Sequence, residues 1–134
     1  MNVIVDTNIF LDYAFERKNN KYAKKFFIDT LSCKHIIFLP EIILEELSSK
    51  NILAEFEKGL FKDLKNKNKL VLIDSNYDLI KESKIISTNR KIPFADVLIA
   101  ISAKQNDCVI ITRDKHLFLD LYDLVDSFKP EELV

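Results

Sequence analysis

The chain has 134 residues, 48% of them hydrophobic, and a formal net charge of -1 at pH 7. This length and composition predict one domain, residues 1–134, that buries its own core without disulfides or structural metal ions. The charge excludes nucleic-acid binding through an overall basic surface. A single glycine excludes the phosphate-binding loops that need several, and two histidines argue against a zinc site with nitrogen or sulfur ligands.

Cys33 and Cys108 lie far apart, without the C-x-x-C spacing, and each precedes or opens an expected strand. Both are interpreted as small buried hydrophobic residues in a reducing cytosol. Asp6 interrupts the N-terminal apolar stretch too early for a signal peptide, and no apolar run approaches the roughly 18 residues that suggest a membrane span. We therefore expect a soluble cytoplasmic protein that does not enter a membrane.

The expected elements begin with a short buried strand, Val3-Ile4-Val5, followed by a helix that Thr7 or Asn8 caps. The apolar pattern then predicts, in order, a helix at residues 21–31, a strand at 35–39, a helix opened by Pro40 and a helix at 52–65. A third strand is expected at residues 70–73.

The second half of the chain continues this alternation. Ser75 and Asp78 have the spacing of a capping box, with Asp in place of the usual Glu or Gln, at the start of a helix at residues 77–87. The remaining expected elements are a helix at 94–103, a strand at 108–112, a short helix from about Lys115 and an edge strand near Leu124-Val125. Strands that alternate with helices indicate an α/β fold whose parallel sheet carries helices on both faces.

Two of the expected strands deliver an acid to the same edge of this sheet. Asp6 follows Val3-Ile4-Val5, and Asp114 closely follows the run Val109-Ile110-Ile111. Ligands and catalytic groups gather at the carboxyl ends of strands in open parallel sheets. A structural role also accounts for each acid alone, because Asp6 could hydrogen-bond its turn and Asp114 could cap the next helix.

Two further acids lie on apolar helix faces. Of the three glutamates Glu41, Glu45 and Glu46, only Glu46 falls inside the apolar arc of its helix at about 100° per residue. Asp96 is surrounded by apolar residues, which is typical of a buried helix. Here too a structural role stays open, since a glutamate at a helix flank can reach water and an aspartate in a first turn interacts with the helix dipole.

Four carboxylates that converge on one pocket repel each other by about 4 kcal/mol per close pair at an effective dielectric constant of about 20. A divalent cation removes this penalty, and Mg²⁺ or Mn²⁺ suits a site with only oxygen ligands. One or two such ions can activate water against a phosphodiester and stabilise the leaving oxygen. The predicted metal ligands and catalytic residues are Asp6, Glu46, Asp96 and Asp114. Asn8 and Thr112 are expected to support these acids, and Arg113, Arg17, Lys18 and Lys21 to meet substrate phosphates.

Four blocks of sequence together resemble the PIN domain, namely VIVDTN, PEIILEEL, PFADVLIAISA and CVIITRD. Their order and spacing resemble the small bacterial and archaeal members, the toxin ribonucleases of VapBC toxin–antitoxin pairs. The resemblance implies a three-layer α/β/α sandwich with a central parallel sheet of four to five strands. It also implies Mg²⁺- or Mn²⁺-dependent cleavage of RNA, frequent homodimers and inhibition by a small antitoxin. By position, the acids of the family fall on Asp6, Glu46, Asp96 and Asp114, and Thr112 matches the hydroxyl residue that often precedes the last.

Two other functions fit parts of the pattern. A PIN-like subunit could hold RNA or a partner protein without cutting, but such a subunit would not need all four acids. A phosphoacceptor signalling domain would use Asp74, after the third strand, with Thr112 and Lys115 nearby. That class wants a pair of adjacent acids after the first strand, where only Asp6 stands, and it leaves both helix acids unexplained.

Overall fold

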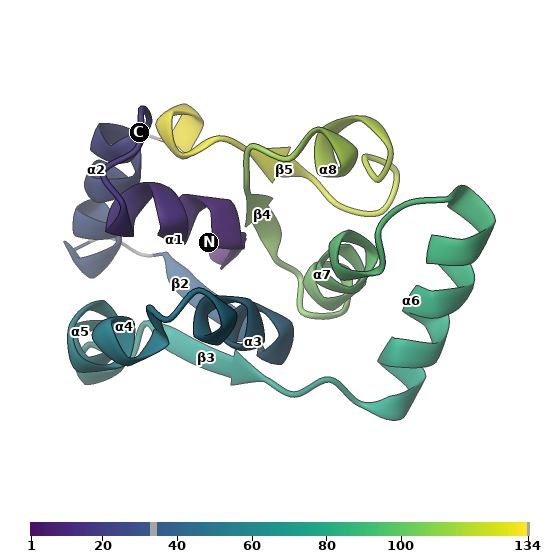
Figure 1. Cartoon of the computed structure of the whole chain (residues 1–134), viewed down its shortest axis with the longest axis horizontal. Helices are drawn as coiled ribbons and strands as arrows, with labels where there is room; N and C mark the ends of the chain where they lie inside the picture. The colour runs from purple at the N-terminus through teal and green to yellow at the C-terminus, as the bar shows by residue number, and fades with distance from the viewer. Residues whose placement is uncertain (33–34, 134) are drawn as a thin grey trace.

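The computed structural model describes residues 1–32 and 35–133, in which strands and helices alternate (Figure 1). The first half contains β1 (Asn2–Val5), α1 (Thr7–Ala14), α2 (Asn20–Ser32), β2 (Ile36–Pro40), α3 (Glu41–Ser49), α4 (Leu53–Lys58) and α5 (Leu60–Asn66). The second half contains β3 (Leu70–Ile73), α6 (Tyr77–Arg90), α7 (Phe94–Gln105), β4 (Val109–Ile111), α8 (Lys115–Leu119), β5 (Ser127–Phe128) and the 3-10 helix η1 (Pro130–Leu133).

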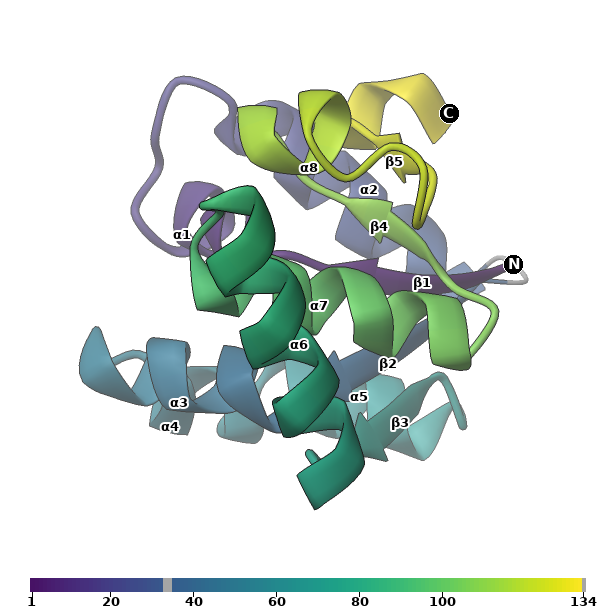
Figure 2. The ribbon, with the colours of Figure 1, turned by 90° about the vertical axis from the view of Figure 1, so that its right-hand side faces the viewer.

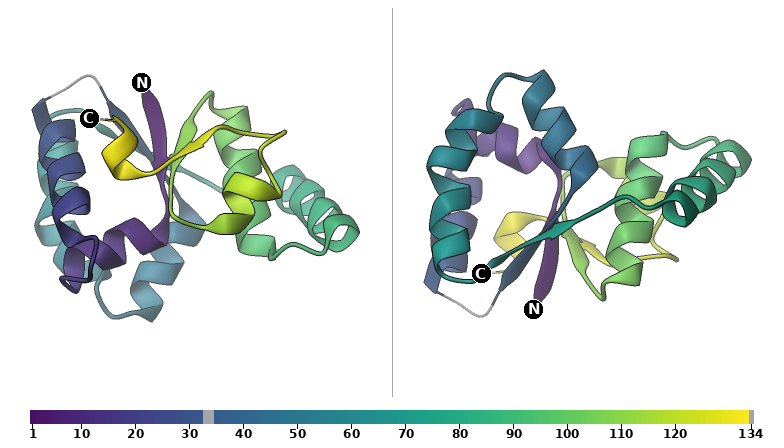
Figure 3. Two further views of the ribbon diagram at one scale, coloured as in Figure 1. Left: turned by 90° about the horizontal axis from the view of Figure 1, so that it is seen from above. Right: turned by 90° about the horizontal axis from the view of Figure 1, so that it is seen from below.

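Across the described ranges the strands form one parallel sheet of five, in the order β3-β2-β1-β4-β5. Helices α1, α2, α4 and α5 cover one face of this sheet, and α7 and α8 cover the other, with α6 outside them, as Figure 3 shows. In Figure 2 the outer helix α6 crosses in front of α7, which separates it from the sheet. The predicted three-layer α/β/α sandwich with a parallel sheet is confirmed.

The position of each strand in the sheet explains how much of it is buried. In β1, the middle strand, Val3, Ile4 and Val5 are 0% exposed, as expected for a parallel strand covered by helices on both faces. In the edge strand β3, Val71 and Leu72 are 40% and 54% exposed. The strand that leads into Asp6 is therefore buried on both faces.

Aromatic rings hold α1 against its neighbours on one face of the sheet. The ring of Phe10 contacts the rings of Phe27, Phe56 and Phe61, with centroid distances of 5.3, 5.4 and 5.6 Å.

Cys108 is buried just before β4, as predicted, and burial raises the pKa of its thiol to about 11. Cys33 lies outside the described residues. None of the helices within 1–32 and 35–133 is long and apolar enough to cross a membrane.

The register of β1 and β4 brings two distant segments together. Val5 lies opposite Ile111, and the Asp6 amide donates a hydrogen bond to the Ile111 carbonyl oxygen at 2.9 Å. Because the two strands are parallel neighbours, Asp6 and Thr112 leave the sheet side by side. The sheet order also reverses direction between β1 and β4, and ligands of open α/β sheets bind in the crevice at such a switch point.

Two predicted helix starts are wrong. Asp6, rather than Thr7 or Asn8, is the N-cap of α1 and accepts a hydrogen bond from the Thr7 amide. Helix α6 has no Ser75–Asp78 capping box at its start; its N-cap is Asn76, which accepts from the Leu79 amide at 2.8 Å. Asn caps as well as Ser does, and the side chain nearest the first turn takes the role.

Two other elements differ from the prediction. The helix expected at residues 52–65 is divided at Gly59 into α4 and α5, and a Cβ at this position would meet the Glu55 carbonyl oxygen at 3.3 Å. The last strand is β5 rather than Leu124-Val125, because Val125 packs into the core from the turn before β5 and is only 8% exposed. Apolar side chains in a turn resemble a strand in sequence.

Candidate active site

The four acids predicted from the sequence lie around the carboxyl edge of the sheet. Asp6 follows β1, and Asp114 follows the neighbouring strand β4. Glu46 comes from α3, and Asp96 comes from the first turn of α7. The four acids are close enough to repel one another. Repulsion by Glu46 and Asp114 raises the pKa of Asp6, and repulsion by Asp114 and Asp6 raises the pKa of Asp96. The fold thus brings together acids from four separate segments.

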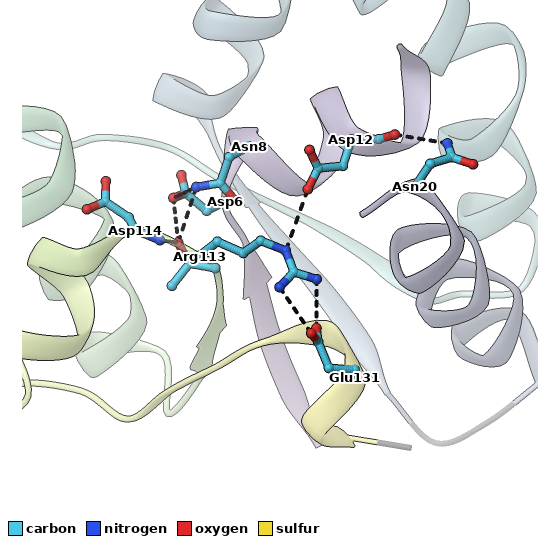
Figure 4. A network of polar contacts seen from close by, with 8 residues as sticks. Asp6, Asn8, Asp12, Asn20, Arg113, Asp114 and Glu131 are labelled. Carbon is cyan, nitrogen blue, oxygen red and sulfur yellow. Dashed lines mark hydrogen bonds and ion pairs between the residues drawn. The ribbon is translucent and has the colours of Figure 1, made fainter. Parts of the chain in front are cut away.

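Asp6 is held by several hydrogen bonds (Figure 4). Its Oδ1 accepts from the Thr7 amide at 2.8 Å, and its Oδ2 accepts from Thr112 Oγ1 at 2.8 Å and from Asn8 Nδ2 at 3.0 Å. The residue is only 6% exposed. Asn8 and Thr112 therefore fix the orientation of a buried carboxylate.

Thr112 links the two strand-end acids. Its hydroxyl donates to Asp6 and accepts from the Asp114 amide at 2.9 Å. Asp114 in turn caps α8, because its Oδ1 accepts from the His116 amide at 2.8 Å. Both strand-end acids thus have the structural role that the sequence left open for them. Capping uses Oδ1 of each acid, whereas Oδ2 of Asp6 accepts the hydrogen bonds from Thr112 and Asn8.

Burial and mutual repulsion make two of the acids hard to ionise. Desolvation raises the pKa of Asp6 to about 6, with repulsion by Glu46 and Asp114 in the same direction and the hydrogen bond from Thr112 opposing it. Desolvation, followed by repulsion from Asp114 and Asp6, raises the pKa of Asp96 to about 7. Carboxyl groups with strongly perturbed pKa values are typical of functional sites.

The three glutamates of α3 have different surroundings. Glu46 is half-buried and close enough to Asp6 to raise the pKa of that acid, whereas Glu45 is exposed. Glu41 lies against Asp74, and a hydrogen bond between the two carboxyl groups raises the pKa of Glu41. Among the three, it is the glutamate inside the apolar arc that faces the acidic site.

The donor atoms of the site suit a hard divalent cation. All four acids offer oxygen, which Mg²⁺ and Mn²⁺ prefer. The carboxamide oxygen of Asn8 is also buried and lacks a hydrogen-bond partner among the described residues, while its Nδ2 bonds Asp6. As the side chains stand, no three Asp, Glu, His or Cys residues of 1–32 and 35–133 form a group that could hold a metal ion. Side-chain rotation would have to draw the acids together.

Arg113 lies between Thr112 and Asp114 in sequence, but its guanidinium points toward Asp12 and Glu131 (Figure 4). Its NH1 and NH2 groups donate to the two carboxylate oxygens of Glu131 at 3.1 and 2.7 Å, and its Nε lies 3.6 Å from Asp12 Oδ2. The Arg113 side chain is 18% exposed. That Arg113 meets substrate phosphate stays a prediction, and phosphate would compete with these two carboxylates.

Sequence reasoning missed both partners of Arg113. Asp12 is an acid within the apolar helix TNIFLDYA, where it is 7% exposed, so the argument that identified Asp96 could have found it. Glu131 belongs to an acidic C-terminal stretch and has no distinguishing pattern around it.

Comparison with protein families places this sheet edge in a known context. The PIN domain family model matches residues 3–124, which include all four acids. The chain belongs to the PIN domain family. No curated protein matches this PIN domain in a sequence search.

Two solved structures resemble the PIN domain over nearly its full length. A toxin–antitoxin complex from Klebsiella pneumoniae gives a TM-score of 0.64 at 17% identity and covers 96% of this chain and 97% of that chain. VapBC2 from Rickettsia felis, bound to a DNA fragment from its promoter, gives a TM-score of 0.60 at 16% identity and covers 96% of this chain and 100% of that chain. At such identities the similarity is one of fold.

The other basic residues predicted to meet RNA come from the far end of α1 and the start of α2. Asp6 caps the first turn of α1, whereas Arg17 and Lys18 follow its last turn, roughly 12 Å along the helix axis. Lys21 lies in the first turn of α2, with its Nζ 4.9 Å from the centre of the Tyr22 ring. An RNA bound at the acids would have to extend along α1 to reach Arg17 and Lys18, which are both exposed.

The sheet order argues against a phosphoacceptor domain. Asp74 follows the edge strand β3, whereas Thr112 follows β4, and both β2 and β1 lie between them. With neighbouring strands about 4.8 Å apart, the ends of β3 and β4 are separated by roughly 14 Å. Asp74 therefore does not share a site with Thr112 and Lys115.

Proposed function

We propose that this PIN domain is a divalent-metal-dependent endoribonuclease that hydrolyses RNA phosphodiester bonds. Its Mg²⁺ or Mn²⁺ would be held by Asp6, Glu46, Asp96 and Asp114. The observation that carries the proposal is the convergence of these acids at the carboxyl edge of the sheet. There Thr112 joins Asp6 to Asp114 through hydrogen bonds, and repulsion among the acids raises the pKa of Asp6 and of Asp96. Clustered carboxylates destabilise one another, and a bound cation reverses that effect.

When bound, the ion would activate a water molecule and stabilise the leaving oxygen of the phosphodiester. The residues of the chain supply orientation. Thr112, Asn8 and the Thr7 amide hold the Asp6 carboxylate in one position, so this ligand is preorganised. Val97 and Leu98 are buried next to Asp96 in α7, and an apolar surrounding strengthens the attraction between a carboxylate and a cation.

Cleavage of labelled RNA by the purified protein tests the proposal. We expect cleavage in Mn²⁺ or Mg²⁺, no cleavage in EDTA, and a loss of at least about 100-fold in Asp6→Asn and Asp96→Asn, each shown to be folded by circular dichroism. Asp63→Asn, which changes an exposed aspartate of α5, is the matched control and should cleave as the wild type does. Equal cleavage by wild type and both site variants would identify a contaminating nuclease and contradict the proposal.

The second candidate is a PIN-like subunit that binds RNA or protein without cutting. It is favoured by the lack, within the described side chains, of a group of three acids ready to hold an ion. RNA binding by the wild type without cleavage, in the presence of either metal, would support this candidate.

We further propose that the nuclease is the toxin of a toxin–antitoxin pair, that it acts as a homodimer in the cytoplasm, and that a small antitoxin inhibits it. Both structural neighbours are toxin–antitoxin complexes and match nearly the whole chain. Co-expression with any small reading frame found beside the gene tests the pairing. A cognate antitoxin should copurify and relieve growth arrest, and light scattering should give twice the mass of the chain. Growth that is unaffected by expression of the active enzyme would contradict the toxin role.

A further inference from the structure

The segment that carries Asp114 is held in place by a cluster of charged side chains. Only Thr112, Arg113 and Asp114 separate β4 from α8, and two of these three residues interact with Asp6. The third, Arg113, extends to η1 at the C-terminal end of the chain. We propose that Glu131 is a positioning residue of the acidic site and acts through Arg113, an inference that rests on the proposed nuclease function.

The pair formed by Arg113 and Glu131 has a defined geometry. Two parallel hydrogen bonds, at 2.7 and 3.1 Å, join the guanidinium to both carboxylate oxygens. Such two-pronged pairing fixes orientation as well as distance. The side chains are 18% and 31% exposed, so water screens this pair less than a fully exposed one. Desolvation would raise the pKa of Glu131, but the hydrogen bond from Arg113 keeps it below its usual value.

Two further elements surround the same guanidinium. Asp12 of α1 places its Oδ2 3.6 Å from Nε, and Tyr22 of α2 places its ring centre 5.8 Å from the guanidinium carbon. Arg113 is therefore the point at which α1, α2 and η1 meet the segment of residues 112–114. Without Glu131, the partners left to the Arg113 guanidinium among residues 1–32 and 35–133 would be Asp12, at a distance too long for a hydrogen bond, and the Tyr22 ring.

Release of the guanidinium would free the Arg113 side of the segment of residues 112–114 to shift, while the Thr112 amide keeps its hydrogen bond to the Phe128 carbonyl oxygen at 2.9 Å. The Thr112 hydroxyl would lose its place between Asp6 Oδ2 and the Asp114 amide. Catalytic geometry is sensitive to such shifts, since a displacement of about 1 Å can cost on the order of 100-fold in rate. Glu131 thus acts on the site through position, without touching RNA or metal.

The test compares Glu131→Ala and Glu131→Gln with a matched control on a similar ion pair. Asp123 accepts two hydrogen bonds from Arg90, both at 2.9 Å, in a pair that joins α6 to the segment after α8. Asp123→Ala therefore removes the same kind of contact elsewhere in the fold. Arg113→Lys is the fourth variant, because lysine keeps the charge but cannot form the two-pronged pair.

The first measurement is amide hydrogen exchange of Asp114 by NMR, which reports the hydrogen bond to Thr112 and requires neither metal nor RNA. We expect exchange about 10-fold faster in Glu131→Ala and Arg113→Lys, an intermediate effect in Glu131→Gln, and no change in Asp123→Ala. Unchanged exchange in Glu131→Ala would overturn the proposal. Should that variant fail to fold, Glu131→Gln decides by the same criterion.

The second measurement is the kinetics of RNA cleavage. A positioning role predicts a roughly 10-fold lower kcat in Glu131→Ala and Arg113→Lys, with KM for RNA and its salt dependence unchanged. A higher KM with normal kcat and normal Asp114 exchange would overturn the proposal and assign the pair to RNA binding. If the wild type does not cleave RNA, the proposed function fails, and the exchange measurement alone decides the role of Glu131.

Discussion

At the scale of single residues, Asp96 is an acid whose ionisation is opposed by burial and by the neighbouring carboxylates of Asp114 and Asp6. Its pKa is about 7 in the folded chain against an ordinary value of 3.8. Because the folded-state pKa is the higher one, its contribution to stability is complete below about pH 4 and is lost as the pH rises through 7. Asp96→Asn has no carboxyl group to ionise at this position, so it does not lose this stability as the pH rises.

In EDTA, we therefore expect the free energy of unfolding of the wild type to fall between pH 5 and pH 8. The free energy of unfolding of Asp96→Asn should fall by about 1 kcal/mol less than that of the wild type, once solvent screening of this partly exposed group is allowed for. Urea unfolding at both pH values measures the difference, and Asp63→Asn should follow the wild type. The same pH dependence in wild type and Asp96→Asn would show that burial does not oppose ionisation of Asp96.

Thr112 is the residue whose hydroxyl joins Asp6 to Asp114. It is 0% exposed, so Thr112→Val removes the partner of the Asp114 amide and leaves Asp6 Oδ2 with the hydrogen bond from Asn8 alone. We expect a loss of about 1–3 kcal/mol in the free energy of unfolding and a higher Asp6 pKa, measured by urea unfolding and carboxyl NMR titration. Thr112→Ser keeps the hydroxyl and should stay close to the wild type. A Val variant as stable as the Ser variant would contradict the linking role.

At the scale of elements, the start of α6 provides a simple test. Asn76 caps this helix through the Leu79 amide, whereas the sequence pattern pointed to Ser75. Asn76→Ala should lower the free energy of unfolding by about 1 kcal/mol, and Ser75→Ala should leave it nearly unchanged. Urea unfolding of the two variants decides between them, and the opposite ranking would restore the Ser75 capping box.

Local patterns explain which elements and acids could be predicted. The runs that became β1 and β4 are apolar and short, and an acid after a strand or on an apolar helix face stands out in sequence. The break at Gly59 and the position of β5 depend on how the chain packs in three dimensions. Arg113 and Glu131 are 18 positions apart and no periodicity relates them, so their pairing could not be derived from the sequence.

At the scale of the whole molecule, the sheet order creates the site. Placing β1 between β2 and β4 lets one acid follow each of two adjacent strands and lets α3 and α7 add one acid each. A PIN fold alone does not fix an activity, because function belongs to the site rather than to the fold. The central claim therefore concerns these four acids and the cation they would hold.

Anomalous diffraction from crystals soaked in Mn²⁺ tests that claim most directly. We expect an anomalous peak at the carboxyl edge of the sheet, within about 2.5 Å of oxygens from Asp6 and at least two of Glu46, Asp96 and Asp114. The peak should be absent from Asp6→Asn crystals grown and soaked in the same way. A wild-type crystal with no peak at this edge, or with Mn²⁺ bound only elsewhere, would contradict the four-carboxylate site.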